Sequence, residues 1–274
     1  MVQVMLLLIR QMLMNKEQIL YEDKDIIVCH KPAGIATQTA RIGQRDMVSE
    51  VSNYLGAPVK LVHRLDQPVE GILVFAKSQK AAGELGRQIT SNQMEKYYYA
   101  VVAVNSEVNV PVLDEADSVQ NKVGKIEFIE GKNEITLINY LYKDNKTNTS
   151  AVVTKDKNGA KRAELRYTLL DRSSVRNFVS ESLIDFKDID IALARIELLT
   201  GRHHQIRVQM SHAGMSLLGD YKYADERTKN LSELLGQKNV ALCAYKLTFN
   251  HPITGKRMSF QKEPESEIFQ NFSL

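Results

Sequence analysis

The stretch HRLDQPVEGILVFAK, at residues 63–77, decides how this chain of 274 residues is interpreted. Residues 71–76 form a continuous apolar run behind a turn, which is typical of a buried strand. Asp66 precedes that run, with Arg64 before it and Pro68 and Gly71 after it, so it lies in a shaped turn. A carboxylate beside a cation can stay ionised and serve as a nucleophile or a base. Taken alone, the pattern also fits a turn aspartate that only binds nearby backbone amides.

Most other segments of the chain predict short strands. Apolar runs bounded by turn residues indicate strands at residues 19–29 (with a polar turn at 22–25), 96–104, 135–142, 151–154, 162–171, 189–200, 241–250 and 256–261. Helical spacing indicates helices at residues 46–55, 79–89, 205–212 and 231–236. Because strands outnumber helices, we expect an α+β domain built on a mixed, mainly antiparallel sheet with flanking helices and loops. The sequence has no glycine-rich phosphate-binding motif after a strand, so it gives no support for a nucleotide cofactor.

The composition is that of a globular chain with one local basic segment. The chain has 36 Lys and Arg residues against 33 Asp and Glu residues, a formal net charge of +3, and 43% hydrophobic residues. These values exclude a disordered or low-complexity chain. Residues 195–212 are rich in Arg and His, and Glu197 is their only acid. Such a segment suits phosphate or another anionic partner, although a solvated basic face has the same pattern.

Cysteine and histidine positions favour a reducing compartment and give no sign of a metal site. Cys29 and Cys243 lie far apart, which fits neither a disulfide framework nor a structural zinc site, so we expect a cytoplasmic protein. His203 and His204 are adjacent, and neighbouring side chains on a strand point to opposite faces. We therefore expect no metal ligand set from this pair.

We interpret residues 17–274 as a single domain in which residues 105–162 form a variable excursion of strands and loops. Residues 1–16 are interpreted as an N-terminal extension that the functional chain can do without. Arg10 interrupts its apolar part, which is also shorter than the roughly 20 residues that cross a bilayer. We therefore expect no membrane association, and the absence of a heptad pattern gives no reason to propose a coiled-coil dimer, so a monomer is expected.

Two further segments carry candidate chemistry. In Lys96-Tyr-Tyr-Tyr-Ala100, strand alternation places Tyr97 and Tyr99 on one face and Tyr98 on the other. Tyr98 can be an ordinary strand aromatic, or a ring that stacks on a base and handles a proton. The segment at residues 200–207, Thr-Gly-Arg-His-His-Gln-Ile-Arg, gathers hydrogen-bond donors without an acid.

In their order along the chain, these motifs resemble the RluA-type pseudouridine synthases. The likeness is carried by the 63–77 stretch, by Lys96-x-Tyr98-x-Ala100, and by the 200–207 segment followed by Gly219-Asp220. The Lys-Pro-Ala-Gly sequence at 31–34 and the His-Pro-x-Thr-Gly sequence at 251–255 match as well. The resemblance covers about residues 17–262 and implies the pseudouridine synthase fold, as a stand-alone catalytic domain without the S4-type RNA-binding domain that many relatives carry.

The resemblance implies an enzyme that isomerises selected uridines in structured rRNA or tRNA, with no cofactor and no metal. It makes Asp66 the essential carboxylate, which either attacks C1′ or removes the 2′ proton. It makes Arg207 the arginine that pairs with Asp66 and keeps it ionised, and Tyr98 the ring that stacks on the target base and takes the C5 proton. The expected contacts to RNA come from Lys31, His63, Arg64, Arg202, His204 and Gln205.

The sequence also departs from the family pattern. Relatives usually carry small hydroxyl residues between the aspartate and the glycine, where this chain has Gln67-Pro-Val-Glu70, and this difference puts substrate choice in doubt. His203 stands where Thr is common, and Cys243 where His is common. Two alternatives stay open: a catalytically silent RNA-binding or ribosome-assembly protein on the same fold, and an unrelated Asp-dependent hydrolase.

Overall fold

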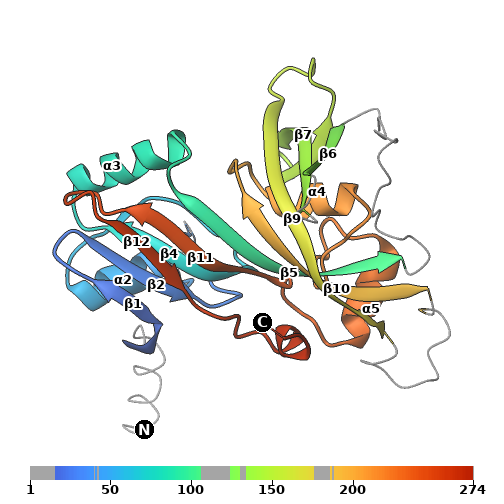
Figure 1. Cartoon of the computed structure of the whole chain (residues 1–274). Coiled ribbons are helices and arrows are strands. Elements are labelled where there is room, and N and C mark those ends of the chain that lie inside the picture. The colour runs from blue at the N-terminus through green and yellow to red at the C-terminus, as the bar shows by residue number, and fades with distance from the viewer. Residues whose placement is uncertain are drawn as a thin grey trace, which may run out of the picture. The chain divides into compact units, whose positions relative to one another are not determined.

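The computed structural model describes residues 16–39, 41, 43–105, 124–129, 134–175, 186 and 188–273 (Figure 1). The chain forms two compact units. Unit 1 comprises Met1–Glu95 and Ala244–Glu265, and unit 2 comprises Lys96–Cys243 and Ser266–Leu274. The prediction of a single domain over residues 17–274 stays a prediction, and the expected N-terminal extension lies almost wholly outside the described residues. No helix in the described ranges is long and apolar enough to cross a membrane.

Unit 1 is a small antiparallel sheet with two helices. Its elements are η1 (Lys16–Gln18), β1 (Ile19–Glu22), β2 (Ile26–Lys31), α2 (Met47–Leu55), β3 (Lys60–Leu61), β4 (Glu70–Ala76), α3 (Gln79–Thr90), β11 (Leu242–Asn250) and β12 (Arg257–Gln261). The strand order is β1-β2-β4-β11, with β12 paired to β11 and β3 paired to β4. The β1–β2, β2–β4, β3–β4 and β11–β12 pairs are antiparallel. Only the first two residues of β11 belong to unit 2.

The core of unit 1 lies around β2 and β4, in which every residue is buried. One face of these strands packs against Leu85 of α3. Residues of the opposite parity, such as Cys29, point to the other face. There, burial raises the pKa of the Cys29 thiol, and the negative charge of Glu50 in α2 adds to this effect. The 71–76 run thus forms the buried strand that its sequence predicts.

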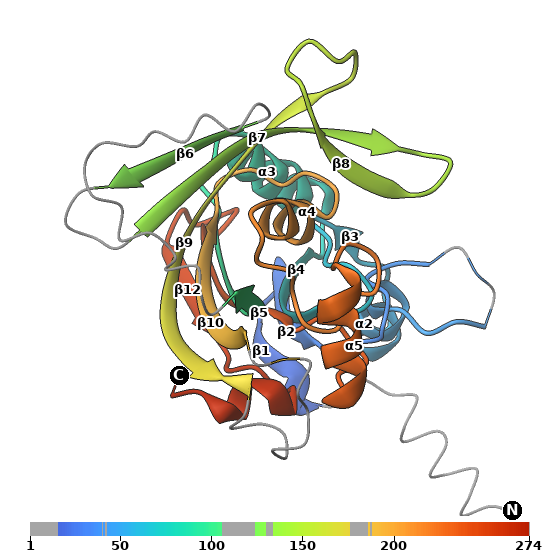
Figure 2. The same cartoon turned by 90° about the vertical axis from the view of Figure 1, so that its right-hand side faces the viewer.

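Unit 2 is a second antiparallel sheet. Its elements are β5 (Glu95–Asn105), β6 (Gly124–Ile129), β7 (Glu134–Asp144), β8 (Thr149–Val153), β9 (Lys161–Ser174), β10 (Ile189–Leu198), α4 (Gln205–His212), α5 (Glu226–Leu234) and η4 (Glu267–Asn271). The strand order is β5-β10-β9-β7-β6, with β8 paired to β7. Helix α4 packs against β7 and β8 (Figure 2), and Val208 joins Leu141 and Ala163 in a small apolar cluster. The expected α+β class with a mainly antiparallel sheet is confirmed.

The helix boundaries follow local capping chemistry. Asp46 and Ser78 cap α2 and α3 by accepting hydrogen bonds from Ser49 N and Ala81 N. Helix α5 begins at Glu226, five residues before the predicted start, because Asp225 caps it by accepting from Thr228 N. Part of the 105–162 excursion, residues 106–123 and 130–133, lies outside the described residues.

A close backbone approach at Gly71 gives the first prediction. Gly71 has φ +134°, and a Cβ there would lie 2.5 Å from Ala244 N and 2.6 Å from Ala244 O. Gly71→Ala must therefore move the backbone of β4 or β11, and we expect a loss of more than about 3 kcal/mol of unfolding free energy. Gly83→Ala is the control: its added Cβ meets nothing within 4 Å on α3, and it should gain up to about 1 kcal/mol. Urea unfolding measures the stability of both variants. Equal stability of the two would contradict the close approach of Gly71 to Ala244.

Candidate active site

Asp66 lies in an irregular turn between β3 and β4, and buried groups fix the residues on either side of it. The hydroxyl of Thr37 donates to Leu65 O (2.7 Å) and accepts from Leu65 N (3.1 Å). Asp66 O accepts from Val69 N at 3.0 Å, which closes the turn across Pro68. The half-buried Asp66 carboxylate is thus presented by a backbone that is held immediately before and after it.

Lys31 is a second clamp on this turn. Its side chain is fully buried, and its Nζ donates to three carbonyl oxygens, those of Pro32 (2.8 Å), Ile35 (2.7 Å) and Gln67 (3.2 Å). Burial lowers the pKa of Lys31 to about 7, and the negative charges of Asp66 and Glu70 oppose that shift. Lys31 therefore ties the 32–35 loop to the Asp66 turn. This placement differs from the direct RNA contact expected from the sequence, because β2 carries the side chain into the interior.

The 200–207 segment is organised by Gln205. Gln205 is 3% exposed and accepts through Oε1 from the Thr200 hydroxyl (2.8 Å) and from Arg202 N (2.9 Å), while its Nε2 donates to Glu164 O (3.0 Å). This residue, also expected to contact RNA, instead fixes the loop that presents Arg202. The Arg202 side chain is exposed, and its Nε donates to Arg162 O.

The two adjacent histidines do not point to opposite faces. Their rings stack with centroids 3.7 Å apart, so that expectation is wrong. The reason is that they lie in a turn rather than a strand, and His204 adopts the left-handed conformation (φ +53°) before α4. His203 Nδ1 lies 2.9 Å from Ser150 Oγ, and His204 Nδ1 lies 2.6 Å from the Tyr223 hydroxyl. Both rings are thereby oriented by polar partners.

Arg207 is held by a carboxylate that sequence reasoning did not assign to the site. Asp220 accepts through Oδ2 from Arg207 Nε (2.8 Å) and through Oδ1 from Arg207 Nη2 (2.6 Å), and the two side chains are 1% and 6% exposed. The guanidinium also lies over the Tyr223 ring, 5.0 Å from its centroid. This bidentate pair fixes the plane of the guanidinium. The Gly219-Asp220 pair after the arginine motif was the signal in the sequence.

Backbone pairing connects Asp220 to the strand that carries Tyr98. Ala103 N of β5 donates to Ser216 O, and Leu218 N donates to Val101 O, so the segment before Asp220 runs along β5. Tyr98 lies opposite Ile196 of β10 and is 6% exposed, whereas Tyr97 and Tyr99 are half-buried. The predicted alternation along this strand is confirmed.

Each unit thus brings a different part of the predicted site together. Unit 1 holds Lys31, His63, Arg64 and Asp66, and unit 2 holds Tyr98, Arg202, His204, Gln205 and Arg207. In unit 1, Arg64 is exposed, and His63 is half-buried with its Nε2 accepting from Val74 N at 3.4 Å. The predicted pairing of Asp66 with Arg207 joins residues of the two units and stays a prediction.

Known proteins are similar to this chain in sequence and in fold. The family model described as RNA pseudouridylate synthase matches residues 25–212. The tRNA pseudouridine synthase C of Pasteurella multocida is 26% identical over 250 residues, which cover 88% of this chain and 89% of that protein. The dual-specificity RNA pseudouridine synthase RluA of Haemophilus influenzae is 27% identical over 254 residues, covering 90% and 93%. The structure of human RNA pseudouridylate synthase domain containing 1 has the same fold, with a TM-score of 0.62, 17% identity, and coverage of 90% of this chain and 83% of that one.

The buried Arg207–Asp220 pair yields a prediction about stability. Asp220→Ala leaves the guanidinium without its carboxylate in a buried place, which is expected to lower the unfolding free energy by about 3–5 kcal/mol. The exposed Asp171 serves as the control, and Asp171→Ala should change stability by less than about 0.5 kcal/mol. Urea unfolding at pH 7 makes the comparison, and a loss below about 1 kcal/mol for Asp220→Ala would show that the pair is not a buried one.

The lowered pKa of Lys31 yields a prediction about pH. The unfolded chain keeps the proton of Lys31 up to its ordinary pKa of 10.5, while the folded chain releases it near pH 7. The unfolded state therefore binds more protons between these values, and the stability contributed by Lys31 rises with pH there, by up to about 1.4 kcal/mol per pH unit. In urea unfolding at pH 7 and pH 9, the wild-type protein should gain stability relative to Lys31→Met as the pH rises. Lys80→Met is the exposed control, and the stability difference between the wild-type protein and this variant should not change with pH. If the stability difference between the wild-type protein and Lys31→Met also stays constant with pH, the lowered pKa of Lys31 is refuted.

Proposed function

Because the chain belongs to the family of RNA pseudouridylate synthases, we propose that it isomerises selected uridines of structured tRNA or rRNA, with Asp66 as its essential carboxylate. The reaction class follows from the family: the protein is an isomerase that converts uridine in RNA to pseudouridine. The RNA class is inferred from relatives whose names specify tRNA or dual specificity. The proposal rests above all on the Asp66 turn, which lies within the matched region and is clamped on both sides.

Asp66 is proposed to act at the ribose. The reaction breaks the bond between N1 of the base and C1′, and then joins the base to the sugar through C5. An ionised Asp66 can start it either by attacking C1′ or by removing the 2′ proton. A turn fixed by Lys31 and Thr37 supports either role, because it keeps the carboxylate in one position while the base rotates.

Arg207 and Tyr98 are proposed to complete the site. A guanidinium beside Asp66 favours the ionised carboxylate, and the bond to Asp220 fixes how the guanidinium is presented. Tyr98 is proposed to stack on the target base and to take the proton that leaves C5. Its place on β5, beside the segment that carries Asp220, supports a common site for the two residues.

The substrate nucleotide must leave its stack to reach such residues. Flipping a base costs a few kcal/mol, which aromatic stacking and phosphate contacts offset. We propose that the exposed Arg64 and Arg202, together with His63 and His204, supply contacts to RNA. Lys31 and Gln205 are proposed to act indirectly, by positioning the Asp66 turn and the Arg202 loop.

Tritium release from RNA labelled with [5-³H]uridine tests the proposal. Wild-type protein should release tritium from a tRNA or an rRNA fraction, and Asp66→Asn should reduce the rate by about a thousandfold or more, because the essential carboxylate is lost. The exposed Asp171→Asn should leave the rate unchanged.

The fractions also separate the alternatives. Release from one fraction alone assigns the RNA class. A folded, RNA-binding wild-type protein that releases no tritium from either fraction would favour the catalytically silent alternative, and an unchanged rate for Asp66→Asn would reject Asp66 as the essential carboxylate.

A further inference from the structure

Two groups of side chains in unit 1 have the composition of a metal site, and they differ in how their polar atoms are satisfied. One group is Asp23, Asp25 and His251, and the other is His30, Glu70 and Glu265. In each group, one ligand atom from each residue lies within 4.8 Å of the others. Composition alone does not distinguish them, because clusters of acids with a histidine also occur as hydrogen-bonded scaffolds.

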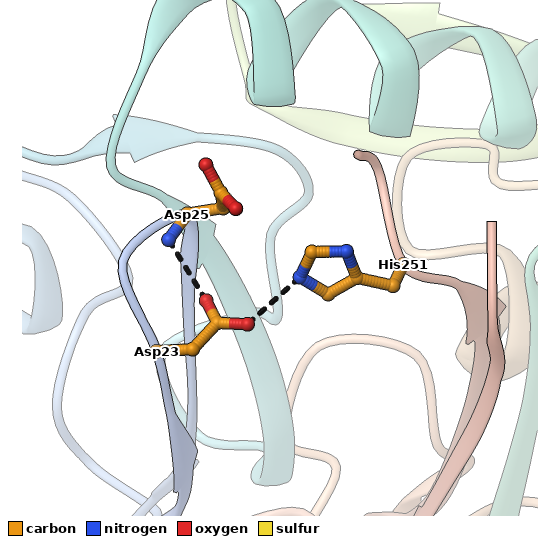
Figure 3. A group of neighbouring side chains, drawn as sticks. All are labelled: Asp23, Asp25 and His251. Atoms are coloured by element: carbon orange, nitrogen blue, oxygen red, sulfur yellow. Dashed lines mark hydrogen bonds and ion pairs between the residues drawn. The ribbon is translucent and has the colours of Figure 1, made fainter. Parts of the chain in front are cut away.

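The polar atoms of the Asp23 group form hydrogen bonds with one another and with the nearby backbone. Asp23 accepts from Asp25 N (2.8 Å) and Ile26 N (2.9 Å), and His251 Nε2 lies 2.8 Å from its other oxygen (Figure 3). His251 Nδ1 accepts from Thr254 N at 3.1 Å, so the proton must be on Nε2, which donates to Asp23. Burial opposes the charge of Asp23, but these hydrogen bonds outweigh it and lower the pKa of the carboxyl group. The group closes the turn between β1 and β2 and has no vacant ligand atom on its histidine.

The His30 group is different because its histidine lacks hydrogen bonds. His30 is fully buried in β2, and within the described residues neither of its ring nitrogens has a hydrogen-bond partner. Nε2 lies 3.9 Å from Glu70 Oε2, and Nδ1 lies 3.5 Å from Glu265 Oε1. A buried polar atom without a partner costs about 1–3 kcal/mol, so the arrangement is incomplete without a further atom.

We propose that His30, Glu70 and Glu265 bind a divalent first-row transition metal ion, for which Zn²⁺ is the probe. One imidazole nitrogen with two carboxylate oxygens is a common zinc ligand set, and a water completes the tetrahedron. The imidazole distinguishes this site from the all-oxygen sites that Mg²⁺ prefers. The proposal adds a site to the protein and is independent of the proposed function.

The mobility and charge of the ligands fit this assignment. His30 and Glu70 are buried and fixed by the β2–β4 ladder, where His30 lies opposite Ile72. Glu265 is 53% exposed, so its carboxylate is free of tight packing and can move toward a bound ion. The two carboxylate ligands bring negative charge to the site, which favours a divalent cation.

Lys262 competes for the same carboxylate. Its Nζ lies 3.0 Å from Glu265 Oε1, and it is the charge that a metal ion would displace. Because both side chains are partly exposed, this ion pair is weak. Removal of the lysine should therefore strengthen metal binding, whereas removal of a ligand should weaken it.

Zinc binding to the purified 274-residue chain tests the site. We expect one Zn²⁺ per chain after removal of free metal, measured by elemental analysis, and an affinity measured by competition with a chromophoric chelator. Glu70→Gln and Glu265→Gln should each weaken binding by at least about tenfold, and Lys262→Met should strengthen it severalfold. Asp25→Asn, in the Asp23 group, should bind as the wild type does, and Mg²⁺ should not compete.

A separate measurement keeps the test independent of folding. Glu265 is half exposed, so Glu265→Gln should unfold in urea at the wild-type midpoint without metal, and only the wild-type midpoint should rise when Zn²⁺ is added. Failure of the wild type to retain Zn²⁺ would overturn the proposal, as would equal binding by the wild type and both ligand variants. Neither result bears on tritium release, which tests the proposed function.

Discussion

The Asp66 turn depends on the buried ammonium group of Lys31. From the end of β2, Lys31 donates one hydrogen bond to Gln67 O in this turn and two to Pro32 O and Ile35 O in the neighbouring loop. A fully buried cation is costly, which its lowered pKa reflects. The position of the charge is fixed by a rigid strand, because Lys31 is the last residue of β2 and pairs with Gly71 of β4. Both strands lie in the most buried part of unit 1. Precise placement of the proposed catalytic carboxylate of Asp66 requires support of this kind.

Unit 2 has a similar arrangement, in which a buried charged side chain holds a residue of the proposed site, but with the signs of the charges exchanged. There the cation, Arg207, is the proposed site residue, and its buried partner is the carboxylate of Asp220. Both oxygens of Asp220 are engaged, and Oδ1 also accepts from Lys222 N and Tyr223 N. In each unit a charged group is therefore placed by a second buried group that does not need to touch substrate. The apolar core around β2, β4 and α3 offsets the cost of burying the Lys31 side chain in unit 1.

The sequence predicted what depends on local pattern. Strand alternation around Tyr98 and the buried 71–76 strand both follow from the periodicity of the sequence. It could not predict that Lys31 and Gln205 are buried, because Lys31 has one partner 36 residues away and Gln205 has one 41 residues away. Nor could it predict the stacked histidines, since one residue with positive φ changes the direction of both rings.

The residues after Asp66 depart from the family pattern, and the acid among them, Glu70, is buried within unit 1. An acid in this turn, Glu70, could have been expected near the substrate, where it would repel phosphate. Instead Glu70 is 3% exposed at the start of β4, its Oε2 accepts from Glu265 N at 3.0 Å, and it faces His30. The Glu70 carboxylate thus points into unit 1, toward His30 and the backbone of Glu265. The acid among the unusual residues at 67–70 therefore bears first on how β4 packs within unit 1.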